Sequence, residues 1–169
     1  MSTPQDTPQD TPQDTPQDTP QDTPQDADPR SPADAAALTS LLRSWMPFAK
    51  ALGLEAERGA ADEVIVRGAW APERCTAGGV LHGGYLMALA DSTGAACAVF
   101  NLPADSTTST IESKTNFFRP VSEGSVQVRS TPVHVGRPTI VVQPDVTRAD
   151  GALVTRTTQT QAVLPAKRA

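Results

Sequence analysis

The chain has 169 residues, enough for one domain with a sizeable core and short for two. Its 14 basic and 19 acidic residues give a net charge of −5, but six of the acids and none of the bases lie in the first 26 residues. The remainder therefore carries 13 acids against 14 bases, a net charge of +1. Because no basic patch is present, we expect neither nucleic acid nor an anionic membrane as a partner.

The sequence shows no membrane-spanning segment, no signal peptide and no disulfide pattern. No segment approaches the roughly 18 uncharged apolar residues of a membrane-spanning helix, and the start of the chain lacks the basic-then-apolar order of a signal peptide. Cys75 and Cys97 form neither a disulfide framework nor a metal-type spacing, as is usual in a reducing compartment. We expect a soluble cytoplasmic protein that holds no metal.

The N-terminal segment contains six consecutive copies of TPQD, from Thr3 to Asp26. It has no large apolar side chain after Met1, so it cannot build a core. The repeat is also far shorter than the roughly 20 to 50 residues of a solenoid unit. We predict a disordered acidic tail and linker over residues 1–30 and one folded domain over residues 31–169.

The first folded elements follow this tail. Five apolar residues at helical spacing across 35–49 predict a helix with one packing face: Leu38, Leu41, Leu42, Trp45 and Phe48. Ser31 and Pro32 offer an N-cap and a first-turn proline near its start, and Pro47 should end or bend it. Residues 52–58 and 62–70 alternate imperfectly around a short glycine-containing loop, which predicts a pair of strands.

The rest of the domain predicts one helix followed by strands. Residues 83–100 combine a narrow apolar stripe with small residues and favour a slender central helix. Four β-rich segments then lie near 107–118, 124–135, 137–148 and 152–164, separated by turn residues. Without helical stretches between them, these segments predict an antiparallel meander rather than βαβ units. The fold class is α+β.

The stretch GGVLHGGYLMALADSTG at 78–94 places one carboxylate, Asp91, inside the predicted central helix. It is the sole formal charge between Arg74 and Asp105. Aspartate is unfavourable in the interior of a helix, and no lysine or arginine lies three or four residues from Asp91 to pair with it. We therefore interpret Asp91 as a chemical group rather than an ordinary surface aspartate.

Four features, in this order along the chain, resemble the hotdog-fold acyl-CoA thioesterases of the PaaI and 4-hydroxybenzoyl-CoA thioesterase branch. They are GxxHGG at 79–84, an acid nine residues after His82, a strand ending NFFRPV at 116–121, and a VGR turn at 135–137. The resemblance covers most of residues 35–164. It implies five to six antiparallel strands wrapped around one long central helix, with an N-terminal helix. It also implies hydrolysis of a small aryl- or medium acyl-CoA thioester, with coenzyme A as part of the substrate and no cofactor.

Thioester hydrolysis needs hydrogen-bond donors where negative charge develops on the carbonyl oxygen, and an attacking group. Gly83 and Gly84 begin the predicted helix, where amides have no internal partner, so they are candidates for an oxyanion hole. Asp91 lies about 10–12 Å further along the axis, at ~1.5 Å per residue, too far to share a site within one chain. His82 is as consistent with capping the backbone as with catalysis.

The resemblance resolves this distance, because it implies a homodimer in which the acid of one subunit faces the helix start of the other. In such a shared site Asp91 acts either as a nucleophile, through a mixed anhydride, or as a general base on water. The dimers are expected to associate into a homotetramer. Thr110, near the start of the long strand, could orient the water or could simply be a strand-forming threonine.

The remaining site residues are expectations of the same kind. Thr76 stands where many relatives carry asparagine or glutamine, and its hydroxyl donates a single hydrogen bond. Arg119 and Arg137 could bind the phosphates of coenzyme A, or could be solvated turn residues. The acyl pocket would be lined by Tyr85, Met87, Phe117 and Phe118, which could equally belong to the core.

Three other functions compete with thioester hydrolysis. A hotdog hydratase would need a differently placed histidine and acid. A cysteine hydrolase using Cys75 and His82 lacks a group to orient the base. The serious alternative is a non-catalytic acyl-CoA-binding protein that keeps the fold, which Thr76 leaves open.

Overall fold

The computed structural model describes residues 34–166, so the predicted tail at residues 1–30 lies outside the described part. These residues form three α-helices, one short 3₁₀ helix and six strands, in this order: α1 (Ala35–Trp45), α2 (Pro47–Ala51), β1 (Glu55–Gly59), β2 (Val64–Ala69), η1 (Pro72–Arg74), α3 (Gly83–Val99), β3 (Ser106–Phe117), β4 (Ser125–Val135), β5 (Thr139–Arg148) and β6 (Leu153–Pro165). All predicted helices and strands are therefore present, within a few residues of their predicted ends.

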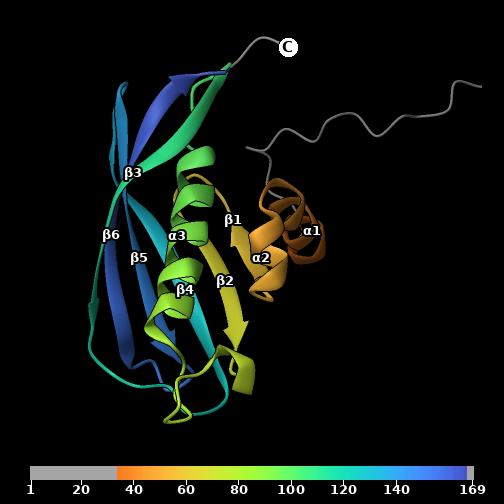
Figure 1. Cartoon of the computed structure of the whole chain (residues 1–169). Helices are drawn as coiled ribbons and strands as arrows, with labels where there is room; N and C mark the ends of the chain where they lie inside the picture. The colour runs from red at the N-terminus through yellow and green to blue at the C-terminus, as the bar shows by residue number, and fades with distance from the viewer. Residues whose placement is uncertain (1–33, 167–169) are drawn as a thin grey trace, which may run out of the picture.

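The six strands form one antiparallel sheet in the order β1-β2-β4-β5-β6-β3, curved around α3 (Figure 1). The predicted fold class and the predicted wrapping of the sheet around one long helix are confirmed. The predicted meander is correct for β4, β5 and β6 and wrong for β3, which pairs with β6 rather than β4. The connection from β3 to β4, residues 118–124, passes the start of α3, where the Leu81 N–H donates to the Val121 carbonyl at 2.8 Å. It crosses the sheet instead of making a hairpin.

The predicted N-terminal helix is two helices. Met46 closes α1, and Pro47 opens α2, which confirms the expected effect of this proline. The predicted N-cap pair was wrong: Asp34 caps α1, because its side chain accepts from the Ala36 and Ala37 amides at 3.0 and 2.9 Å. Ser31 and Pro32 lie outside the described residues.

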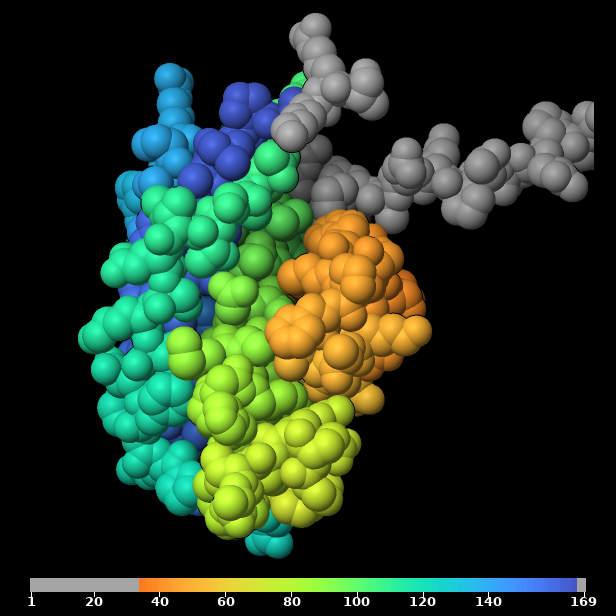
Figure 2. All heavy atoms as spheres, in the orientation of Figure 1, coloured from red at the N-terminus to blue at the C-terminus, as the bar shows by residue number. Residues whose placement is uncertain are grey.

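The predicted apolar stripe of helix α3 is buried, and so are small and polar residues on its other sides, so the buried surface is wider than predicted. The helix contacts every strand from β2 to β6, and its small residues allow this close approach. Figure 2 shows part of α3 at the surface between β3 and the N-terminal helices. A strip of α3 residues spaced three to four apart is half-exposed: Ala88, Asp91, Ala95 and Val99. None of the helices in residues 34–166 is long and apolar enough to cross a membrane.

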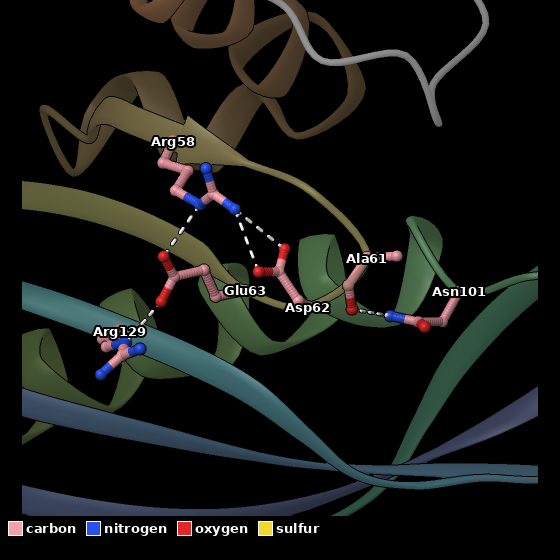
Figure 3. A network of polar contacts seen from close by, with 6 residues as sticks. All are labelled: Arg58, Ala61, Asp62, Glu63, Asn101 and Arg129. Carbon is pink, nitrogen blue, oxygen red and sulfur yellow. Dashed lines mark hydrogen bonds and ion pairs between the residues drawn. The ribbon is translucent and has the colours of Figure 1, made fainter.

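The β1–β2 hairpin is held to the rest of the domain by polar contacts (Figure 3). Arg58 binds Asp62 at 3.0 Å and Glu63 at 2.8 Å, and Glu63 also binds Arg129 of β4 at 2.5 Å. The Asn101 amide donates to the Ala61 carbonyl at 2.8 Å, which joins the hairpin to the end of α3. Exposed ion pairs contribute little singly, so this network mainly orients the hairpin.

Candidate active site

The start of α3 shows how the predicted glycine amides are used. His82 is the N-cap, and its Nδ1 accepts from the Gly84 N–H at 2.8 Å. The Gly84 N–H therefore already has a partner. The Gly83 N–H, in the same turn, has none among residues 34–166. A neutral His82 ring that accepts at Nδ1 carries its proton on Nε2. The capping role considered for His82 is what the structure shows.

Phe117 lies against this helix start. A Cβ added to Gly83 would come within 3.1 Å of the Phe117 ring, so the absence of a side chain lets the ring cover the glycine. Phe117 is half exposed at the end of β3. The structure therefore brings together Gly83, His82 and Phe117, three of the predicted site residues.

A pocket of about 420 Å³ opens beside the same turn, between α2 and the start of α3. Its lining includes Phe48, Leu52, Arg74, His82, Tyr85 and Ala88. Tyr85 donates to the Leu52 carbonyl at 3.2 Å, and burial raises its pKa while the neighbouring Arg74 opposes that change. Tyr85, predicted for an acyl pocket, thus lies on the α2 side of α3, whereas Gly83 faces Phe117.

Asp91 lies in the middle of α3. It is half-buried, and its side chain contacts Thr110 of β3 and Gln159 of β6. Its Oδ1 accepts from the Gln159 side-chain amide, and the Thr110 hydroxyl lies 3.4 Å from the same oxygen. Gln161 donates to the Thr110 Oγ1 at 2.8 Å, so the hydroxyl proton of Thr110 is free to point to Asp91. No hydrogen bond within the described chain uses Oδ2.

This arrangement places the Thr110 hydroxyl beside the Asp91 carboxylate, and it adds residues that sequence reasoning missed. Gln159 and Gln161 have no exposed surface, and Thr108 donates to Gln161 at 2.9 Å. One signal could have found them: the strand TRTTQTQ, residues 155–161, is polar at every position, so whichever face points inward must bury polar groups.

The two parts of the site are separate within one chain. Asp91 stands eight residues after Gly83 on a straight helix, about 12 Å along its axis at ~1.5 Å per residue. A single subunit therefore presents an amide at one place and a carboxylate at another. The expected sharing of a site between two subunits stays a prediction.

Three further predicted residues lie on the surface. Thr76 is in a turn, and its hydroxyl accepts from the Gly78 N–H at 3.3 Å. Arg119 follows β3 and donates to the Leu153 carbonyl at 2.9 Å. Arg137 lies in the β4–β5 turn, at the end of the sheet where Thr139 pairs with Ala162, and so at the opposite end from Gly83 and Phe117. The chain alone does not bring Arg137 to the other site residues.

The cysteines give no support to cysteine chemistry. The Cys75 thiol donates to the Ala71 carbonyl at 3.2 Å and not to His82. Burial raises the pKa of Cys97 to about 11, although the neighbouring Ser130 hydroxyl opposes the change, so this thiol is protonated at neutral pH. No group of three metal-binding side chains gathers anywhere in residues 34–166.

Comparison with known proteins identifies the family. The Thioesterase superfamily model matches residues 78–155, which span α3 to β6. The structure of a Haemophilus influenzae thioesterase is 26% identical with a TM-score of 0.74, over 80% of this chain and 94% of that one. A variant of the phenylacetic acid degradation protein PaaI of Thermus thermophilus is 32% identical with a TM-score of 0.63, over 69% of this chain and 97% of that one.

A curated protein of Haemophilus influenzae, named as a candidate esterase, is 36% identical over 75 residues, or 44% of this chain and 54% of that protein. The chain thus spans about half the length of the curated relatives that it matches. The matched residues include the HGG turn, Asp91 and Thr110, and the fold agrees over nearly the whole length of the solved relatives. The chain belongs to the hotdog-fold thioesterase superfamily.

Proposed function

We propose that this protein is an acyl-CoA thioesterase that hydrolyses a small aryl- or medium acyl-CoA thioester to the free acid and coenzyme A. The observation that carries the proposal is the carboxylate of Asp91, held at Oδ1 by Gln159 and Thr110, with no hydrogen bond to Oδ2 from residues 34–166. It lies on the half-exposed strip of α3, where a substrate can reach it. Membership of the thioesterase superfamily supports the reaction class.

Each group has a part in the proposed reaction. The Gly83 amide donates to the thioester oxygen as negative charge develops on it. Asp91 Oδ2 either attacks the thioester carbon, releasing the coenzyme A thiolate and leaving a mixed anhydride for water to hydrolyse, or takes a proton from the attacking water. Arg119 and Arg137 are proposed to bind the phosphates of coenzyme A, since both are exposed residues that carry a guanidinium group.

A second copy of the chain completes the proposed site. The sheet order leaves one edge of β3 without a neighbouring strand in residues 34–166, along a strand of 12 residues. Ile111 and Phe117 are 62% and 51% exposed there. An open edge of this kind is a surface for strand pairing. Pairing of two copies would set Asp91 of one subunit near Gly83 of the other, and two such dimers would form the proposed homotetramer.

The main experiment measures release of coenzyme A with a thiol-trapping dye over a panel of aryl- and acyl-CoA substrates. Asp91→Asn keeps the shape of the side chain and removes its charge, so we expect kcat to fall by about 10³-fold or more. Asp150→Asn is the control, because Asp150 is an exposed turn residue paired with Arg148 at 2.7 Å. Its activity should match that of the wild type.

The alternative function gives a different result in the same experiment. The Thr76 hydroxyl accepts from the Gly78 N–H at 3.3 Å and can donate one hydrogen bond, fewer than a side-chain amide, which keeps a non-catalytic acyl-CoA-binding protein as the second candidate. Saturable binding of acyl-CoA without release of the thiol would support that candidate and contradict ours. Light scattering of the wild type tests the assembly, and an active monomer would contradict the shared site.

A further inference from the structure

Gln159 occupies an unusual place in the fold. It lies on the inward face of β6, under α3, and has no exposed surface. The same face of this strand also buries Thr155, Thr157 and Gln161 completely. A long amide in such a position is unfavourable unless its polar atoms find partners. The partners of Gln159 therefore indicate what it does.

The amide nitrogen of Gln159 is directed at Asp91. Nε2 donates to the Asp91 Oδ1, and it also lies 3.4 Å from the main-chain carbonyl oxygen of Asp91 and 3.4 Å from the Thr110 Oγ1. Oε1 is buried with no hydrogen-bond partner in the described chain. The reversed amide would set Oε1 against the carboxylate, so an ionised Asp91 selects the orientation in which nitrogen faces it.

Gly94 makes the space through which Gln159 reaches the helix. A Cβ added to Gly94 would overlap the Gln159 Oε1 and lie 3.0 Å from its Cδ. The same Cβ would lie 3.1 Å from the Pro144 Cγ. Glycine is unfavourable inside a helix, and α3 carries this one three residues after Asp91, beside the glutamine.

We propose that Gln159 is a positioning residue for Asp91. By donating to Oδ1 from the β6 side, Gln159 keeps the carboxylate in one rotamer and directs Oδ2 towards the half-exposed strip. The missing side chain of Gly94 leaves the space that this contact needs. The inference rests on the proposed function, since it concerns the direction of the catalytic carboxylate. It identifies a group that would touch neither the substrate nor the attacking water.

Gln159→Met keeps the length of the side chain and removes the donor. We expect kcat to fall by about 10- to 100-fold, because misplacing a reacting group by about 1 Å can slow a reaction by up to 10²-fold, while KM changes little. Thr157→Val is the matched control, because Thr157 is equally buried on the same face and bonds Thr115 at 2.8 Å rather than Asp91. Its kcat should equal that of the wild type.

Gly94→Ala provides a second route to the same group without removing any polar atom. We expect its loss of kcat to match that of Gln159→Met. In a Gln159→Ala background the added methyl has no glutamine to displace, so Gly94→Ala should cause little further loss. If the two losses instead multiply, Gly94 acts through Pro144 or the helix itself, and the inference is overturned.

Crystal structures of the wild type and of Gln159→Met separate this inference from the proposed function. A rotated Asp91 carboxylate in the variant supports the positioning role, even if the wild type hydrolyses no thioester and the proposed function fails. An unmoved carboxylate together with a wild-type kcat overturns the positioning role and leaves the proposed function intact. Thermal unfolding of each variant shows whether a lost activity reflects lost folding.

Discussion

The two halves of the sheet beneath α3 are equally buried and chemically opposite. Towards β2, β4 and β5 the helix packs on apolar side chains without exposed surface: Val66, Val128, Ile140 and Val142. Towards residues 155–161 of β6 the inward side chains are polar and just as buried: Thr155, Thr157, Gln159 and Gln161. A single helix therefore joins an ordinary hydrophobic core to a polar layer.

The apolar half of the sheet mainly stabilises the domain, whereas the polar half supports the proposed active site. Burial of apolar surface accounts for the first half. The second half carries a desolvation cost that its hydrogen bonds offset in part, since Thr155 Oγ1 and Gln159 Oε1 have no partner within residues 34–166. The polar layer contributes the contacts to Asp91 and Thr110 instead.

The largest stability effect should come from the apolar half. Leu89 has no exposed surface. Strand β2 approaches it closely because Gly68 has no side chain: a Cβ at that position would lie 2.5 Å from the Leu89 side chain. Leu89→Ala should lower the free energy of unfolding by about 2–5 kcal/mol, measured by urea titration. Activity per folded molecule should stay at the wild-type level. A variant of normal stability that has lost activity would break the comparison.

Cys97, which lies beside Ser130, should make stability depend on alkaline pH. Burial raises the pKa of its thiol from 9.0 to about 11, so between these values the folded protein keeps a proton that the unfolded chain loses. The contribution is fully present below pH 9.0 and is lost as pH rises towards about 11, to a maximum of roughly 3 kcal/mol. Urea titrations across this range should show the decline.

Cys97→Ala is the test of that decline, and Cys75→Ala its control. The fall in unfolding free energy between pH 9.0 and about 11 should be shallower in Cys97→Ala than in the wild type. Cys75→Ala should retain the wild-type slope. Equal slopes in all three proteins would show that the thiol at position 97 is not the group responsible.

The smallest effects should have opposite signs at neighbouring positions of the polar layer. Thr155→Val removes a buried hydroxyl that has no partner among the described residues, so it should stabilise the domain by about 1 kcal/mol. Thr157→Val removes the bond to Thr115 at 2.8 Å and should destabilise it by about the same amount. Two changes of the same sign would indicate that pairing does not decide the stability of this layer.

Much of the local structure could be predicted from the sequence because it depends on near neighbours. Glycines 124 and 151 mark turns at positive φ of 74° and 79°, which predicted where strands end. Pro47 predicted the break between α1 and α2. The GxxHGG pattern and the isolated charge of Asp91 predicted the helix start and the central carboxylate.

The partners of these elements could not be predicted in the same way. Turn signals show where the chain reverses but not which strand it then joins, so the pairing of β3 with β6 was missed. The Gly84 amide was expected to be free, and the cap contact with His82 engages it. The polar strand at residues 155–161 indicated that polar groups would be buried, but it could not show that Gln159 and Gln161 are among them, because both faces of the strand are polar.

The sequence by itself determined the elements, their order, the family and the identity of the charged group at the centre. Each of these depends on residues close together in the chain or on a local pattern. The tertiary structure decided which face of β6 turns inward and which side chain reaches Asp91. It also decided that Gly94 opens the space for that contact. Those features depend on residues as far apart as Asp91 and Gln159, which meet only when the sheet curves around the helix.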